Sequence, residues 1–307
     1  MVTGLLGGIF FALDTVILSM AMVLPVYSED LRSIFLAPYI SNFLHFVFSA
    51  AILGVYFGSK KQFRSIFHSL RCRGGLFILL AAFLGGPVGM TAYVVSIHYI
   101  GPSFTAAVSA LFPAVGALLA YLFLKEKMSV FQIIGLLVSV VGVAALGYSP
   151  GTDSVINAPL GFLFAAICCL GWALESILFS YGFRRCEITQ GQALFLRQML
   201  SAVICGLVIL PLLRGWERAI QVIPDSATLY ILLGALFLTI SYLCYYRAIL
   251  SIGATKAMAL NITYTVWAIV FSILLMHTIP DAKSVLCSIL ILAGALGASA
   301  GVRRLPQ

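Results

Sequence analysis

The chain has 307 residues, of which 62% are hydrophobic and only 9% are charged, and its formal net charge is +8. Soluble domains carry roughly 25% charged residues, so this composition excludes a soluble globular protein. A basic excess can indicate a nucleic-acid partner, but the placement of the basic residues, described below, argues against one.

Apolar segments long enough to cross about 30 Å of hydrocarbon recur from end to end, separated by short turns that contain Pro, Gly or charged residues. The first segment has no Lys or Arg before it and no small-residue cleavage site after it, so we interpret it as a span and not as a removed signal peptide. We therefore predict an all-α membrane protein of ten transmembrane helices, at residues 3–24, 34–57, 75–98, 103–124, 130–149, 159–182, 191–213, 228–250, 257–276 and 284–302.

Basic residues are unequally shared between the two sides of the predicted membrane. With the N-terminus inside, the inner loops and the C-terminus hold thirteen: Lys60, Lys61, Arg64, Arg71, Arg73, Lys125, Lys127, Arg184, Arg185, Arg247, Lys256, Arg303 and Arg304. The opposite loops hold four: Arg32, Arg214, Arg218 and Lys283. The positive-inside rule predicts both termini in the cytoplasm, and the net charge is then an orientation signal.

The sequence contains an internal repeat. The segment Ala12–Ser19 matches Ala173–Ser180 in chemical type at every position except the seventh, and Tyr93–Ala145 aligns without gaps on Tyr245–Gly297. We predict two five-helix halves, residues 1–150 and 155–304, within a single membrane domain. Because five is odd, the second half enters the membrane from the other side, which is the inverted-repeat plan of secondary transporters.

Two carboxylates fall in the middle of predicted spans, where a charged side chain costs about 3 kcal/mol on insertion scales. They are Asp14 and Glu175, which occupy matching positions in the two halves. We predict that both face a cavity; a buried structural ion pair or hydrogen bond is the alternative. Arg197 also lies inside a span, with Gln198 beside it, and the sequence favours a structural role for this arginine over contact with a substrate.

Aromatic residues accompany the two carboxylates. Phe11 and Trp172 each precede the matched acid by three residues, which puts ring and carboxylate on one helix face. Electron-rich rings around a carboxylate suit an organic ammonium ion through cation–π attraction. We extend the candidate ligand set to Tyr93, Tyr242, Tyr245, Asn261, Tyr264 and Trp267. The alternative, packing or an interfacial belt, fits most of the Phe residues and Trp216.

Several predicted helices contain small residues or proline. Gly85, Gly86 and Pro87 are adjacent, and we expect them to kink or break the third helix, lining a cavity or serving as a hinge. Glycines spaced along the fifth and tenth helices predict packing surfaces. The seven cysteines lie mostly mid-helix and form no Cys-x-x-Cys, so we interpret them as small apolar residues.

The sequence also resembles a known superfamily. Leu124-Lys125-Glu126-Lys127-Met128-Ser129, leading into Gln132, Gly135 and Gly142, is similar to a motif of EamA-type members of the drug/metabolite transporter superfamily. A closer resemblance, to LicB-type choline permeases, is carried in order by Gly86–Met90, Tyr99–Gly101, Trp172–Ser176, Leu196–Gln198, Ser241–Tyr246 and Leu260–Trp267. This resemblance implies uptake of choline linked to the proton gradient, with Trp172, Glu175, Tyr242 or Tyr245, and Tyr264 around the ammonium group.

These patterns together predict a secondary active, proton-coupled transporter of choline or a related organic cation, working by alternating access. The roles of the acids stay open: one holds the substrate while the other takes the proton, or both meet positive charge. An exporter of amino acids or other metabolites is the alternative function. We expect no enzymatic activity, cofactor or metal, since metal, nucleophile-elbow and phosphate-loop motifs are absent. The expected setting is the cytoplasmic membrane of a prokaryote, as a monomer or weak homodimer in contact with lipid.

Overall fold

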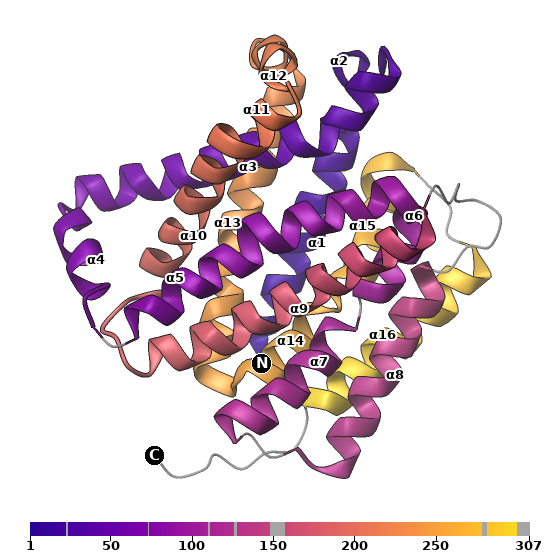
Figure 1. The fold of residues 1–307 in the computed structure, drawn as a ribbon. Helices are drawn as coiled ribbons and strands as arrows, with labels where there is room; N and C mark the ends of the chain where they lie inside the picture. Colours follow the sequence, from indigo (N-terminus) through magenta and orange to yellow (C-terminus); the bar gives the residue numbers. More distant parts are fainter. Residues whose placement is uncertain are drawn as a thin grey trace.

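The computed structural model describes residues 1–22, 24–72, 74–109, 111–125, 128–147, 157–277 and 281–299. These residues form helices and connecting segments, with no strand among them (Figure 1). Within this part of the chain, seven helical segments are long and apolar enough to cross a membrane: Val2–Met22, Leu31–Ser59, Gly75–Ser96, Ala158–Phe183, Gln190–Leu212, Ala227–Ile252 and Ala254–Met276. Three shorter apolar helices cover Phe112–Leu124, Val130–Ala145 and Val285–Ala298.

The helices follow in the predicted order. Residues 1–147, here called the N-terminal part, contain α1 (Val2–Met22), α2 (Pro25–Ser28), α3 (Leu31–Ser59), α4 (Phe63–Ser69), α5 (Gly75–Phe83), η1 (Leu84–Met90), α6 (Thr91–Ser109), α7 (Phe112–Leu119), η2 (Ala120–Leu124) and α8 (Val130–Gly147). Residues 157–299, the C-terminal part, contain α9 (Ala158–Phe183), α10 (Gln190–Ile204), η3 (Cys205–Ile209), α11 (Leu210–Leu212), α12 (Trp216–Val222), α13 (Ala227–Ile252), α14 (Ala254–Asn261), α15 (Tyr264–Met276) and α16 (Ala282–Ser299).

The two parts are packed into each other instead of side by side. Extensive helix contacts join α1 to α13, α6 to α9, α3 to α10 and α8 to α16, and each of these pairs one helix of the N-terminal part with one of the C-terminal part (Figure 1). Large apolar clusters accordingly draw on both parts of the chain. A cavity formed between these helices is therefore lined from both parts.

Side-chain caps fix where several long helices begin. Asp30 accepts a hydrogen bond from the backbone N–H of Ser33 at the start of α3, and this bond lowers the pKa of the Asp30 carboxyl. Asn157 caps α9 in the same way. Thr189 and Gln192 form a reciprocal capping box at the start of α10. Each cap pairs N–H groups that have no partner inside the helix.

The third predicted helix is distorted where glycine and proline are adjacent. Residues Leu84–Met90 form a π-helical segment, η1, between α5 and α6. Pro87 has no N–H to donate, so regular α-helical pairing is broken there. The predicted irregularity is confirmed, and the chain remains helical through it.

Helix ends differ from the prediction in two places. The turn expected between residues 98 and 103 is helical, and the change comes later, because α6 ends at Ser109 and α7 begins at Phe112. In the C-terminal part, α13 ends at Ile252 and is followed by Gly253, whose φ of 87° is open to glycine but strained for other residues. The ninth predicted helix is itself divided into α14 and α15.

The cysteine interpretation is wrong for two of the seven residues. Cys72 and Cys186 form a disulfide across a sequence separation of 114 residues, with their Cα atoms 5.9 Å apart. Both lie in connecting segments that the packing of α5 on α9 brings together. The remaining five are free thiols, of which four are buried.

Contacts between α8 and α16 fit the predicted glycine packing surfaces. A β-carbon at Gly142 would lie 2.9 Å from the Ile291 side chain, and Ser139 donates a hydrogen bond of 3.0 Å to the Ile291 carbonyl. Some predicted features lie outside the described residues: the boundary near 150–155, Gly301 and four of the basic residues, Arg73, Lys127, Arg303 and Arg304.

Candidate functional site

A cavity lies where the two parts of the chain meet, with an aromatic and polar lining. Phe11 on α1 and Phe112 on α7 come from the N-terminal part. The C-terminal part contributes the other lining residues from α9, α13, α14 and α15: Trp172, Glu175, Ser176, Ser241, Tyr242, Tyr245, Asn261 and Tyr264. The cavity volume is about 40 Å³.

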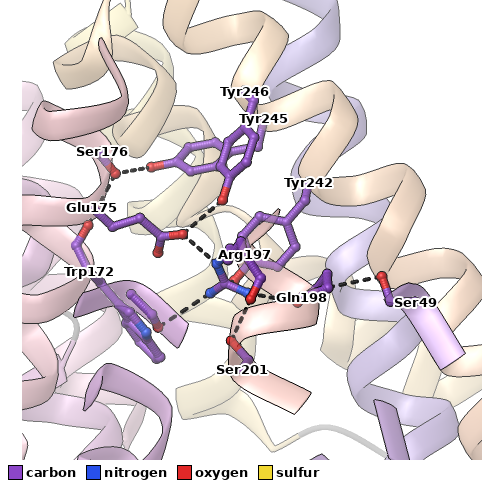
Figure 2. Close-up of polar contacts among 11 residues, drawn as sticks. Ser49, Trp172, Glu175, Ser176, Arg197, Gln198, Ser201, Tyr242, Tyr245 and Tyr246 are labelled. Atoms are coloured by element: carbon purple, nitrogen blue, oxygen red, sulfur yellow. Dashed lines mark hydrogen bonds and ion pairs between the residues drawn. The ribbon is translucent and has the colours of Figure 1, made fainter. Parts of the chain in front are cut away.

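Glu175 is the charged residue of this lining, and its carboxylate is paired. Arg197 on α10 donates from Nε to Oε1 of Glu175 at 2.5 Å (Figure 2). The hydroxyl of Tyr246 donates to the same oxygen at 2.8 Å. Both members of the ion pair are buried, with 1% of Arg197 and 4% of Glu175 exposed. Burial of this kind is tolerated only where charge and hydrogen bonds are satisfied together.

The guanidinium of Arg197 has further partners in addition to Glu175. Nη1 donates to Oε1 of Gln198 at 3.2 Å, and Nη2 donates to the Tyr242 hydroxyl at 2.9 Å and to the Gly85 carbonyl at 3.3 Å. Its central carbon also stands 4.3 Å from the centroid of the Tyr242 ring. Figure 2 shows the guanidinium between Glu175, Tyr242 and Gln198. The planar fork of arginine supplies enough donors for all of these contacts.

The polar network continues on two sides of the Glu175–Arg197 pair. Gln198 donates to the Ser49 hydroxyl at 3.0 Å, and Ser49 shares a hydrogen bond of 2.7 Å with Thr239. On the other side, Ser176 and the Tyr245 hydroxyl are 2.7 Å apart (Figure 2). These contacts fix the orientation of the groups that surround Glu175.

Three glycines of η1 allow its backbone to approach this network. A β-carbon at Gly85 would overlap the Glu175 carboxylate, and one at Gly86 would collide with the Ser201 hydroxyl. A β-carbon at Gly89 would lie 2.9 Å from the Trp172 ring. The glycine-rich segment therefore places its backbone against the acid and the largest aromatic residue of the cavity.

Aromatic rings form two walls of the cavity. On one side Phe11 and Tyr264 have ring centroids 4.8 Å apart, and Tyr242 stands edge-on to Phe11 at 6.4 Å. On the other side Trp172 meets Phe112 edge-on at 5.9 Å. Tyr93 stacks behind Trp172 at 5.4 Å and is not part of the lining. Rings held in this way present their faces and edges in fixed directions.

Asp14 lies outside the aromatic cavity and faces a histidine. Its Oδ1 is 2.8 Å from Nε2 of His45 on α3, and 4% of Asp14 and 3% of His45 are exposed. The two atoms are close, but they are not aligned as a hydrogen bond and have no other hydrogen-bond partner. Gly234 on α13 closes the third side, where a β-carbon would lie 2.8 Å from Asp14 Oδ1 and 3.2 Å from His45 Nε2.

The structure brings most of the predicted ligands together. Around the cavity it places Phe11, Trp172, Glu175, Tyr242, Tyr245, Asn261 and Tyr264, whereas Asp14, Tyr93 and Trp267 lie outside its lining. Sequence reasoning did not assign Arg197, Tyr246 or His45 to the site. Signals for two of them were present, since Arg197 is charged within a span and Tyr246 follows Tyr245 in the motif of α13. A role in binding stays a prediction for every one of these residues.

The lining of the cavity combines one carboxylate with several aromatic rings. Its one carboxylate supplies negative charge, its rings supply electron-rich faces, and the hydroxyl of Ser241 already donates to the Gly7 carbonyl at 2.7 Å. A quaternary ammonium ion has no N–H to donate, so it binds through charge and ring faces, as this lining provides.

Comparisons with known proteins agree with this description. The profile of the EamA-like transporter family matches residues 2–148 and again residues 159–300. Protein LicB of Haemophilus influenzae is 36% identical over 219 residues, which is 71% of this chain and 73% of LicB. A protein of known crystal structure shares the fold with a TM-score of 0.72 at 16% identity, covering 97% of this chain and 96% of its own.

Proposed function

Because this chain belongs to the EamA-like transporter family, we propose that it moves choline or a related organic ammonium compound across the cytoplasmic membrane of a prokaryote. The observation that carries the proposal is the single carboxylate of Glu175 in a cavity walled by Trp172, Tyr242 and Tyr264. Similarity to Protein LicB accords with the sequence resemblance to choline permeases. Multi-pass membrane location follows from the apolar helices and the family.

Alternating access follows from the proposed inverted repeat. The family profile matches two separate ranges, 2–148 and 159–300, and the helix pairs are those that a two-fold exchange of the halves requires. Exchange of the halves replaces α1 by α9, and α13 by the η1–α6 segment, so the α1–α13 contact becomes the contact of α9 with η1 and α6. The α3–α10 and α8–α16 pairs each join equivalent helices of the two halves and are unchanged by the exchange. Rocking of one half against the other would open the cavity to each side in turn.

Interruptions of the helices occur next to the cavity. Asn261 ends α14, Tyr264 begins α15, and Phe112 is the first residue of α7. Transporters of this general plan bind substrate at discontinuous helices near the midplane. The positions of these three residues support the cavity as the transport site, with both termini in the cytoplasm as the basic residues indicate.

The coupling proton, in this proposal, is carried by Asp14 and not by Glu175. Glu175 already has a permanent cation beside it in Arg197, because guanidinium groups stay protonated in proteins. Asp14 instead faces the imidazole of His45, and histidine is the residue type that proteins most often use to transfer protons. Both groups are buried between α1, α3 and α13, where a change of charge alters how the helices pack.

Thermal stability of the purified protein tests the ligand class. A ligand that binds only the folded state raises stability by RT ln(1 + [L]/Kd). We expect choline and other quaternary amines to raise the melting temperature, and amino acids and other metabolites to leave it unchanged. A shift with amino acids alone would favour the exporter function instead. Uptake of labelled choline into proteoliposomes, with and without an imposed pH gradient, then tests transport and coupling.

A further inference from the structure

A transporter of this kind must reorient without substrate to complete its cycle. During that step the negative charge of a buried carboxylate has to be compensated by a proton or by another cation. An unpaired carboxylate inside a low-dielectric core is strongly unfavourable. In this structure the carboxylate of Glu175 is compensated from within the chain by Arg197. The empty site therefore already holds a cation.

The position of Arg197 resembles the one expected for a bound ammonium ion. Its guanidinium contacts the carboxylate of Glu175 and lies over the face of Tyr242, the two kinds of contact that the proposed substrate would use. The cavity next to it has a volume of about 40 Å³, which is room for about three water molecules. A ligand can enter only as neighbouring groups give way.

Arg197 would keep three hydrogen-bond acceptors if its contact with Glu175 were broken. The Gln198 side-chain oxygen, the Tyr242 hydroxyl and the Gly85 carbonyl all accept hydrogen bonds from its Nη atoms, while the carboxylate contact is made through Nε. These three acceptors are neutral, so they can hold the guanidinium without competing for the substrate's charge. The pair with Glu175 is thus the contact that a second cation would replace.

We propose that Arg197 is a resident cation of the transport site, an inference that rests on the proposed function. The substrate ammonium and the guanidinium compete for Glu175: the substrate displaces Arg197 on binding, and Arg197 returns when the substrate leaves. The returned ion pair lets the empty protein reorient without a proton on Glu175. The apparent affinity for substrate equals the intrinsic affinity multiplied by the fraction of time that the carboxylate is free of Arg197.

Substitution of Arg197 separates this role from a structural one. If the arginine competes with substrate, Arg197→Ala binds choline at least about tenfold more tightly than wild type. Added methylguanidinium fills the vacated space, competes with choline and raises its apparent Kd back toward the wild-type value. A purely structural arginine predicts weaker choline binding in Arg197→Ala and no competition by methylguanidinium.

Arg185 provides the matched control. It stacks on Tyr181 at 3.9 Å, a similar arginine–tyrosine contact away from the cavity lining. Arg185→Ala is expected to bind choline as wild type does, with no added effect of methylguanidinium. If Arg185→Ala gains the same affinity as Arg197→Ala, the effect is not local to the site and the inference is overturned.

A flux measurement on wild-type protein needs no substitution and covers the case in which Arg197→Ala does not fold. With equal pH on both sides, choline efflux into choline-free buffer should be within about threefold of choline–choline exchange, because the empty protein reorients as a neutral pair. Efflux far slower than exchange overturns the inference while the proposed function stands. Absence of choline binding and transport by wild type overturns the proposed function itself.

Discussion

Gly85 and Gly234 have the same relationship to the two buried carboxylates: a methyl group at either position would collide with the acid on the neighbouring helix. Gly85 lies against Glu175, which pairs with Arg197, and Gly234 lies against Asp14, which pairs with His45. A group made of one acid, one base and one glycine thus occurs twice in the molecule. The helices that hold one group are those that the proposed inverted repeat would exchange with the helices that hold the other. The base of one pair is a guanidinium, and the base of the other pair is an imidazole.

Replacement of Gly85 by alanine should remove ligand binding. The new methyl group would overlap the Glu175 carboxylate, and a shift of that carboxylate would break the hydrogen bonds that Arg197 and Tyr246 donate to its Oε1. We expect choline affinity to fall at least about tenfold, the result of a shift of about 1.4 kcal/mol or more. Gly54→Ala is the control, since its methyl group would meet only Phe195 at an ordinary 3.5 Å. Equal losses in both variants would contradict the proposed packing.

The aromatic walls are tested by truncation. Trp172→Ala and Tyr264→Ala should each weaken choline binding by about 1 to 2 kcal/mol, because each removes a ring face from the cavity. Trp216→Ala serves as the comparison: Trp216 is 37% exposed and lies on α12, where its ring N–H donates to the Gly206 carbonyl. Isothermal titration of the three variants distinguishes them, and similar losses in all three would indicate general destabilisation.

Glu175→Gln should remove both binding and stability. The amide keeps the shape but leaves Arg197 buried without its counter-ion, which we expect to cost about 3 to 5 kcal/mol of unfolding free energy. Replacing both partners, as in Glu175→Gln with Arg197→Met, should recover most of that stability without recovering choline binding. Chemical denaturation and equilibrium binding measure the two effects separately. Concentrative uptake by Glu175→Gln at a near-normal rate would refute the proposed role of the acid.

Asp14 and His45 are expected to govern the response to pH. If this pair carries the coupling proton, Asp14→Asn and His45→Gln should keep choline binding but make uptake insensitive to an imposed pH gradient. If Asp14 instead meets a second positive charge, Asp14→Asn weakens binding itself. Proteoliposome uptake with and without the gradient, beside equilibrium binding, separates these outcomes. Uptake that still follows the gradient in both variants would exclude the pair as the proton carrier.

Topology is tested with fusions and thiol labelling. Thirteen basic residues against four predict that Gln307 is cytoplasmic. A reporter active only in the cytoplasm, fused after Gln307, should therefore be active, and one placed in the segment between α11 and α12 near Arg214 should not. Activity of a periplasmic reporter after Gln307 would reverse the assigned orientation.

The helical order and much of the cavity could be predicted from sequence because both depend on local or repeated patterns. Apolar length marked the spans, and the repeat placed Phe11 with Trp172 and Phe112 with Tyr264. What could not be predicted depends on which helix faces meet. Asp14 and Glu175 are matched in sequence, yet only Glu175 lines the cavity, because Asp14 points toward His45 on α3. No spacing rule joins residues 14 and 45 before the packing is known.

The same limit applies to the helix ends and to Arg197. The expected turn at Gly101 and Pro102 remains helical, because proline is tolerated where the surrounding helices hold the backbone. Arg197 was expected to be structural, and its ion pair fits that description; its contact with the face of Tyr242 brings it to the edge of the ligand cavity. The sequence shows that Arg197 is a charged residue within a span, but it does not show that Glu175 is its partner.

The Cys72–Cys186 bond has a practical consequence for any measurement of this protein. It ties the segment before α5 to the segment after α9, and so fastens the N-terminal part to the C-terminal part at one end of the molecule. The positive-inside rule predicts that this end faces the cytoplasm, where thiols are kept reduced. In protein purified in air this bond would restrain the movement of α5 against α9, and reducing agent would release it. Choline binding is therefore best measured with and without reducing agent, because a difference between the two curves would show that the bond limits how these helices move.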